Sequence, residues 1–144
     1  MLDIRPIDSR FAVAPQIAPE DAAEIRAAGY VLVINNRPDD EAPGQPTGEA
    51  VEAACRAVGL DYLAVPVDHH GFRLDQVTAT LDAIAAANGP ILAYCRSGTR
   101  SCHLWALASA GMGVPVDDLI VQAGGAGYDL AGARPLLQSV AAGA

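Results

Sequence analysis

The chain has 144 residues, 51% of them hydrophobic, so it is long enough to bury the core of one domain. Its net charge of −8 argues against binding to nucleic acid or to an anionic membrane, and we expect an anionic substrate to be small and held by local arginines. All 9 basic residues are arginines, which excludes a Schiff-base lysine and the lysine of a Walker-type phosphate loop.

Short apolar strands alternate with helices along the chain. Continuous apolar runs predict strands at residues 11–14, 30–36, 60–67 and 90–94. Helical spacing of apolar residues predicts helices at residues 19–29, 47–59, 74–89, from about 100, at 116–122 and at 133–141. We expect Thr47 to cap a helix, Pro66 to mark an edge strand or a strand end, and the glycine-dense segment 124–128 to form a turn. The alternation predicts an α/β fold with a mostly parallel central sheet flanked by helices on both faces, as a single domain over residues 1–144.

The segment that follows the last predicted strand, Tyr94 to Ser101, carries the strongest functional signal. Cys95 stands at the strand end, a glycine-containing turn follows, and Arg100 opens the next helix. Backbone N–H groups of such a turn converge on an anion, and the helix N-terminus adds positive potential that favours a thiolate. Arg100 adds a planar, permanently charged fork. We therefore expect Cys95 to be a nucleophile at the floor of an anion-binding loop formed by Arg96, Ser97, Gly98, Thr99 and Arg100.

Two further side chains follow predicted strand ends, where the ligands of parallel sheets bind. Asp68 comes after the third strand and Arg37 after the second, so we expect one crevice to hold both beside Cys95. Arg37 also stands close to acidic residues, and salt bridging to them is favoured over a second contact with the substrate anion. These acids are Asp39, Asp40 and Glu41.

These segments resemble a known bacterial family, whose members have been labelled both phosphatase and sulfur transferase. Residues 34–39, 44–46, 93–101 and 126–130 look like the phosphatase-like domain of the β-lactamase hydrolase-like proteins, and the order of elements is similar to that of the dual-specificity phosphatases. The resemblance implies a cysteine-phosphatase-like fold of the dual-specificity type. It also implies that Asp68 is the general acid and that the Ser101 hydroxyl stabilises the thiolate as a leaving group. The adjacent His69 and His70 are alternatives that could replace Asp68 as the acid or tune it. Without the resemblance, Asp68 is a turn residue and Ser101 caps a helix.

The length of the anion-binding loop leaves the transferred group open. Four residues separate Cys95 from Arg100, as in rhodanese-type sulfurtransferases, whereas dual-specificity phosphatases have five. Three phosphate oxygens accept about six hydrogen bonds, and the loop amides together with Arg100 supply roughly seven N–H donors. The loop is therefore still able to bind phosphate. We expect first a hydrolase that acts on a phosphate monoester through a Cys95 thiophosphate. The alternatives are a sulfurtransferase with a persulfide on Cys95 and a module that only binds an anion.

The remaining signals concern the compartment and the other sulfur and imidazole groups. Three cysteines, an odd number, indicate a reducing compartment, and the first residues lack the basic-then-apolar order of a signal peptide. Since no apolar run approaches the roughly 20 residues of a membrane span, we expect a cytoplasmic protein, and no cofactor.

Cys55 fits the apolar stripe of its helix, and packing is favoured for Cys102 over a disulfide with Cys95. The histidines, which are His69, His70 and His103, fit no metal-site spacing.

Overall fold

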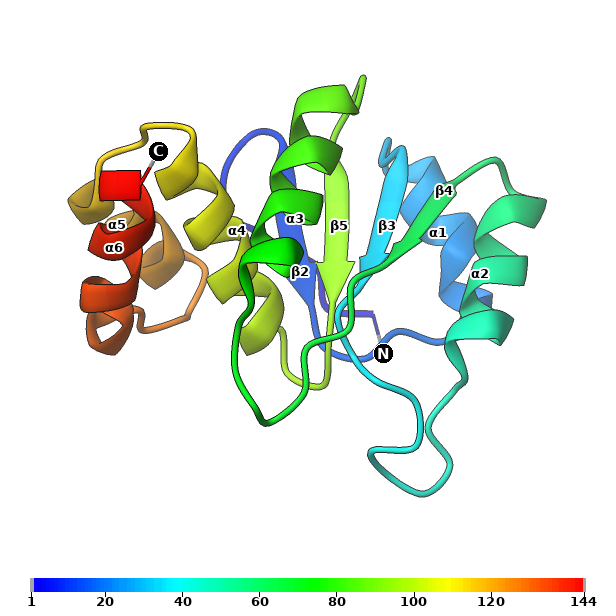
Figure 1. Ribbon diagram of the computed structural model, residues 1–144. Helices are drawn as coiled ribbons and strands as arrows, with labels where there is room; N and C mark the ends of the chain where they lie inside the picture. Colours follow the sequence, from blue (N-terminus) through cyan, green and yellow to red (C-terminus); the bar gives the residue numbers. More distant parts are fainter. Residues whose placement is uncertain (1, 144) are drawn as a thin grey trace.

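The computed structural model describes residues 2–143 and centres on a five-stranded sheet of order β1-β2-β5-β3-β4 (Figure 1). The strands are β1 (Arg5–Pro6), β2 (Phe11–Ala14), β5 (Ile91–Tyr94), β3 (Leu32–Asn35) and β4 (Asp61–Ala64). β1 is antiparallel to β2, and the other neighbouring strands are parallel. The predicted mostly parallel sheet is therefore confirmed.

The four parallel strands end at one level. Tyr94 at the end of β5 is opposite Asn35 of β3 and Ala14 of β2, and Asn35 is opposite Ala64 of β4. Figure 1 shows the long loops after β3 and β4 extending from this edge of the sheet. The loops after β2, β3, β4 and β5 thus begin side by side, where the ligands of such sheets bind.

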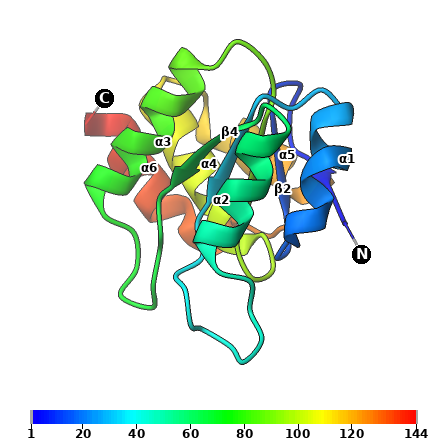
Figure 2. The same ribbon diagram turned by 90° about the vertical axis from the view of Figure 1, so that its right-hand side faces the viewer.

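Helices cover both faces of the sheet, as predicted. One face carries η1 (Pro19–Asp21), α1 (Ala22–Ala27) and α2 (Gly48–Ala57), and the other carries α3 (Leu74–Ala86), α4 (Thr99–Gly111), α5 (Val116–Gly125), η2 (Ala131–Ala133) and α6 (Arg134–Gly143). Figure 2 places α1 on one side of the sheet and α3 and α6 on the other. Successive strand residues point to opposite faces, so Val33 packs with α1 and α2 whereas Ile34 packs with α3 and α4. Each face therefore has its own apolar core, which explains the continuous apolar runs of the strands.

Two elements differ from the expectation. The sequence does not predict β1, because a strand of two residues carries no periodicity. Helix α5 continues through Gly124 and Gly125, where a turn is expected, and the chain turns at Gly127, whose φ is +96°. Leu119 and Ala123 of α5 are fully buried, so packing maintains the helix across residues of low helix propensity.

Thr47 and Pro66 lie at the ends of elements, as expected. The Thr47 hydroxyl accepts a hydrogen bond from the Ala50 N–H at 3.1 Å and caps α2. Pro66 follows the end of β4, which is the edge strand of the sheet. Within residues 2–143, no helix combines the length and the apolar character that crossing a bilayer requires.

Candidate active site

The loop between β5 and α4 places a cysteine within hydrogen-bond distance of a backbone amide. Cys95 follows β5 directly and is only 1% exposed. The Gly98 N–H donates a hydrogen bond to the Cys95 Sγ at 3.2 Å, so the loop curls around the sulfur. Gly98 has a φ of +92°, which favours glycine, and it packs so closely against Tyr128 that an added Cβ would overlap the Tyr128 Oη. Tyr128 Oη also donates to the Ser97 carbonyl at 3.0 Å and fixes the loop from outside.

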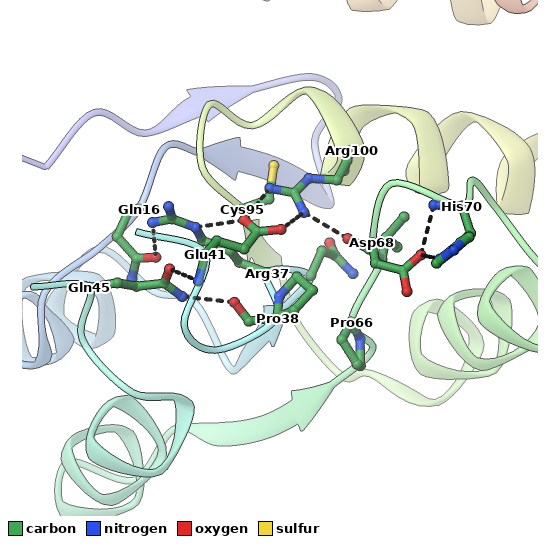
Figure 3. Close-up of polar contacts among 12 residues, drawn as sticks. Gln16, Arg37, Pro38, Glu41, Gln45, Pro66, Asp68, His70, Cys95 and Arg100 are labelled. Atoms are coloured by element: carbon green, nitrogen blue, oxygen red, sulfur yellow. Dashed lines mark hydrogen bonds and ion pairs between the residues drawn. The ribbon is translucent and has the colours of Figure 1, made fainter. Parts of the chain in front are cut away.

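Arg100, in the first turn of α4, lies near the Cys95 sulfur, and two of its donors have no oxygen or nitrogen partner. Its Nη1 donates to the Glu41 Oε2 and to the Val67 carbonyl, both at 2.7 Å, and its Nη2 donates to the Glu41 Oε1 at 2.8 Å (Figure 3). A guanidinium has five N–H groups, so these bonds leave the Nε–H and one Nη2–H, which share one side of the fork. The hydrogen bonds that Arg100 donates to Glu41 are the largest cause that raises the pKa of Arg100, and the nearby Cys95 acts in the same direction.

Glu41 joins two arginines at this site. Besides Arg100, its Oε1 accepts from the Arg37 Nε at 2.9 Å, and Arg37 also donates from Nη1 to the Gln16 Oε1 at 3.1 Å. The hydrogen bond from Arg100 is the largest cause that lowers the pKa of Glu41, to about 2, and the bond from Arg37 adds to it. The expected salt bridge of Arg37 to its acidic neighbours is confirmed, and its partner is Glu41.

Asp68 lines the same cavity as Arg100, and its carboxylate is turned toward His70. The cavity has a volume of about 410 Å³ and is lined by Glu41, Asp68, His69, Arg96 and Arg100. The Asp68 Oδ1 accepts from the backbone N–H of His70 at 2.9 Å and lies 3.1 Å from the His70 Nδ1. The bond from the His70 backbone is the largest cause that lowers the pKa of Asp68. The structure thus brings Asp68 to the crevice, with its charged form stabilised.

Ser101, in the first turn of α4, is fully buried. Its hydroxyl donates to the Asn36 Oδ1 at 2.8 Å, and the Asn36 Nδ2 donates to the Val65 carbonyl at 2.9 Å. The second bond fixes the orientation of the Asn36 amide, so the hydroxyl proton of Ser101 is directed to Asn36 and away from Cys95.

The other loop residues face outward. Arg96, Ser97 and Thr99 are exposed, and the hydroxyls of Ser97 and Thr99 lie 2.9 Å apart. Arg96 also lines the cavity, where it adds positive potential at the mouth.

The surroundings of Cys55, Cys102 and His103 indicate roles in packing. Burial raises the pKa of Cys55 to about 11 and that of Cys102 to about 12, and all three cysteines are free. His103 shares a 2.8 Å hydrogen bond with the Thr99 carbonyl, and its ring stacks on Phe72 with 5.4 Å between centroids. In the described part of the chain, no three acidic, histidine or cysteine side chains gather in a way that suits a metal ion.

A larger cavity lies on the other side of the loop after β3. It has a volume of about 560 Å³ and is lined by Asn35, Arg37, Pro38, Asp39, Gly48, Glu49, Glu52, Tyr62, Ala64 and Pro66. Three carboxylates against one arginine make this cavity unfavourable for an anion. The smaller cavity is lined by Arg96 and Arg100 of the loop that follows Cys95, and it is therefore the candidate active site.

Glu41 is the residue of this site that the sequence does not assign. It appears in the sequence only as one of several acids near Arg37, and its contact with Arg100 spans 59 positions of the chain. The available signal is its position in the loop after a strand that ends beside Cys95.

The family model and the curated relatives that match this chain carry the same family description. A protein-family model described as "Beta-lactamase hydrolase-like protein, phosphatase-like domain" matches residues 3–112. A β-lactamase hydrolase-like protein from Xylella fastidiosa strain Temecula1 is 37% identical over 125 residues, covering 86% of this chain and 29% of that protein. The chain therefore spans less than a third of the length of this curated relative.

Solved structures extend the comparison to the fold. The crystal structure of a putative phosphatase from Neisseria meningitidis is similar with a TM-score of 0.83, 33% identity, and coverage of 95% of this chain and 97% of that one. PTPMT1 in complex with PI(5)P matches with a TM-score of 0.75 and 14% identity, covering 97% of this chain and 95% of that one, which shows the shared fold alone. Because the family model covers most of the chain, this protein belongs to the family of the phosphatase-like domain of β-lactamase hydrolase-like proteins.

Proposed function

We propose that the protein hydrolyses a phosphate monoester through a covalent thiophosphate on Cys95. The observation that carries this proposal is the nearness of Arg100, which keeps two donors without an oxygen or nitrogen partner, to Cys95, in a loop whose Gly98 amide donates to the sulfur. Together these groups can hold the oxygens of a phosphoryl group directly above the nucleophile. Membership of a phosphatase-like family supports the same chemistry.

In the first step the Cys95 thiolate attacks phosphorus, an S–P bond forms, and the P–O bond to the leaving group breaks. The electron pair of that bond goes to the departing oxygen, which takes up a proton. The loop amides and Arg100 stabilise the negative charge on the three equatorial oxygens of the transition state.

In the second step water attacks phosphorus and gives a proton to the Asp68 carboxylate, the S–P bond breaks, and inorganic phosphate leaves. The electron pair returns to the sulfur and regenerates the thiolate. We propose that Ser101 assists this departure after its hydroxyl rotates from the Asn36 Oδ1, to which it now donates at 2.8 Å, toward the Cys95 sulfur.

We propose Asp68 as the source of the proton for the leaving group. Because the bonds from His70 lower the pKa of Asp68, only a small fraction of this carboxyl is protonated at neutral pH. Leaving groups that depart readily as anions, such as phenolates, therefore suit this site best. The substrate class that we propose is a small phosphate ester, since the net charge of −8 repels large polyanions and the cavity has a volume of about 410 Å³.

Sulfur transfer is the second candidate, and one specific observation favours it. Four residues separate Cys95 from Arg100, the spacing of rhodanese-type loops. In that reaction the thiolate attacks the outer sulfur of thiosulfate, the S–S bond breaks, sulfite leaves, and Cys95 carries a persulfide. This step requires no general acid, so it is insensitive to the low pKa of Asp68.

Side-by-side assays on three proteins distinguish these functions. Wild type, Cys95→Ser and the control Cys55→Ala are each given 4-nitrophenyl phosphate or thiosulfate with cyanide. Cys55 is a buried cysteine on α2, outside the site. We expect wild type and Cys55→Ala to release phosphate and Cys95→Ser to lose at least roughly a thousandfold in kcat. Full phosphate release by Cys95→Ser would refute the mechanism, and thiocyanate without phosphate release would favour sulfur transfer.

A further inference from the structure

We infer that Glu41 is the positioning residue of Arg100: it binds the end of the guanidinium and turns the side of the fork toward the Cys95 sulfur. The inference rests on the proposed role of Arg100 as the group that holds the substrate anion. Glu41 itself does not touch the substrate in this arrangement.

The bonds of Arg100 determine which of its donors face the substrate. The two oxygens of Glu41 take one hydrogen from each terminal nitrogen of Arg100, at 2.7 and 2.8 Å, in a bidentate pair. The Val67 carbonyl takes the second hydrogen of Nη1 at 2.7 Å. The Nε–H and the remaining Nη2–H then form the one two-donor side without an oxygen or nitrogen partner among the described residues, and the Cys95 sulfur is near Arg100. That pair matches two oxygens of a tetrahedral anion.

The position of Glu41 is itself held from behind. Arg37 donates to the Glu41 Oε1 at 2.9 Å, and the Arg37 side chain is only 6% exposed, so this partner is fixed by burial. Gln16 accepts from Arg37 at 3.1 Å, and the Gln16 N–H donates to the Arg96 carbonyl at 3.2 Å. The connection therefore runs from the loop after β2, through the loop after β3, to the anion-binding loop.

Hydrogen bonds within the loop also fix the backbone around Glu41. Gln45 accepts from the Glu41 N–H at 3.1 Å and donates to the Pro38 carbonyl at 2.9 Å, which closes the loop on itself. Asp40, directly before Glu41, has a φ of +64° and is the described chain's single residue other than glycine with a positive φ. A strained backbone persists where surrounding contacts impose it, and the contacts of this loop hold Asp40, the residue before Glu41, in that conformation.

A competing role for Glu41 makes a different prediction. If its carboxylate occupied the place of the substrate anion, substrate would have to displace it, and its removal would strengthen anion binding. The geometry favours positioning, because Glu41 takes the end of the guanidinium and leaves the side pair of donors available.

The test measures the affinity for tungstate, a tetrahedral oxyanion, by isothermal titration calorimetry and needs no turnover. The variants are Glu41→Gln, Arg100→Met, the double variant, and Glu52→Gln as the matched control. Glu52 pairs with Arg56 at 3.0 Å on the exposed side of α2, so the control removes an ordinary surface ion pair. A glutamine accepts through one oxygen only and presents an NH₂ group to the second guanidinium donor.

We expect Glu41→Gln to weaken tungstate binding by about tenfold or more, and Glu52→Gln to leave it unchanged. In the Arg100→Met background, Glu41→Gln should have almost no further effect, because Glu41 acts through Arg100. Equal or tighter binding by Glu41→Gln would overturn the inference, and tighter binding would indicate a competitor. An equal loss in both backgrounds would also overturn it, since it would indicate a general structural role.

Two additions keep the test decisive. If Glu41→Gln does not fold by circular dichroism, Gln45→Ala replaces it, because it loosens the loop without touching either arginine; unchanged tungstate affinity in that variant overturns the inference. Wild type that binds tungstate with the expected variant pattern but releases no phosphate supports the positioning of Arg100 and refutes the proposed phosphatase. The two failures are therefore distinguishable.

Discussion

Replacement of Gly98 by alanine probes the shape of the anion-binding loop. A Cβ at this position would overlap the Tyr128 Oη and lie 3.0 Å from the Tyr128 Cζ, while φ stays at +92°. Alanine in a left-handed conformation costs about 1–2 kcal/mol. Displacement of Tyr128 removes its hydrogen bond to the Ser97 carbonyl, which contributes about 1 kcal/mol. We therefore expect Gly98→Ala to lower the free energy of unfolding by about 2–3 kcal/mol.

Thermal unfolding converts this free energy into a temperature. With about 2.1 cal/mol/K per residue over 144 residues, a loss of about 2.5 kcal/mol lowers Tm by roughly 8 °C. Gly113→Ala is the matched control, because Gly113 has a φ of +95° and nothing within 4 Å of an added Cβ. The control isolates the backbone cost, so it should lower the free energy of unfolding by only about 1–2 kcal/mol.

A double-variant cycle with Tyr128→Phe separates the two contributions to the cost. Without the Tyr128 hydroxyl, the overlap with Oη and the hydrogen bond are both absent and only the tight contact with Cζ remains, so Gly98→Ala should cost about 1 kcal/mol less than in wild type. Activity on 4-nitrophenyl phosphate should fall in Gly98→Ala and persist in Gly113→Ala, because only Gly98 donates its amide to the Cys95 sulfur. Equal destabilisation by both alanine variants, or no coupling to Tyr128, would refute the reasoning.

Three further predictions concern the acid, a helix cap and low pH. Asp68→Asn should slow the hydrolysis of phenyl phosphate about tenfold more than that of 4-nitrophenyl phosphate, since the poorer leaving group depends more on the proton; equal slowing of both substrates excludes Asp68 as the acid. Thr47→Ala should lower the free energy of unfolding in urea by about 1 kcal/mol with KM unchanged, because it removes the cap on the Ala50 N–H, and no change in midpoint would contradict this cap. The pKa of Glu41 is lowered from 4.5 to about 2 by Arg100, so its contribution to stability is full above pH 4.5 and is lost as the pH falls toward 2. Glu41→Gln should therefore flatten the dependence of stability on pH in that range, and an unchanged slope would argue against the ion pair.

The parts that the sequence predicts are those with local causes. Apolar runs flanked by glycines and caps define β2, β3, β4 and β5 to within a few residues, and the Thr47 cap acts on a residue three positions away. The structure of the segment around Cys95 can likewise be predicted from the sequence, because a strand end, a glycine and a helix start follow one another without a gap.

The parts that the sequence leaves open depend on contacts between distant segments. Nothing in the order of residues distinguishes Glu41 from its acidic neighbours, since its bond to Arg100 forms only when the loops after β3 and β5 meet at the sheet edge. The direction of Asp68 is decided by the two bonds to His70, which a turn motif does not specify. The full length of α5 depends on the burial of Leu119 and Ala123, which outweighs the glycines that follow.

The central claim is that Cys95 accepts a phosphoryl group. The direct measurement is the mass of the intact protein after rapid mixing with 4-nitrophenyl phosphate or with thiosulfate and a denaturing quench, followed by peptide mapping. The account predicts an added phosphoryl group on Cys95 that is absent from Cys95→Ser. A single added sulfur atom on Cys95 after thiosulfate, with no phosphoryl adduct at any mixing time, would contradict it.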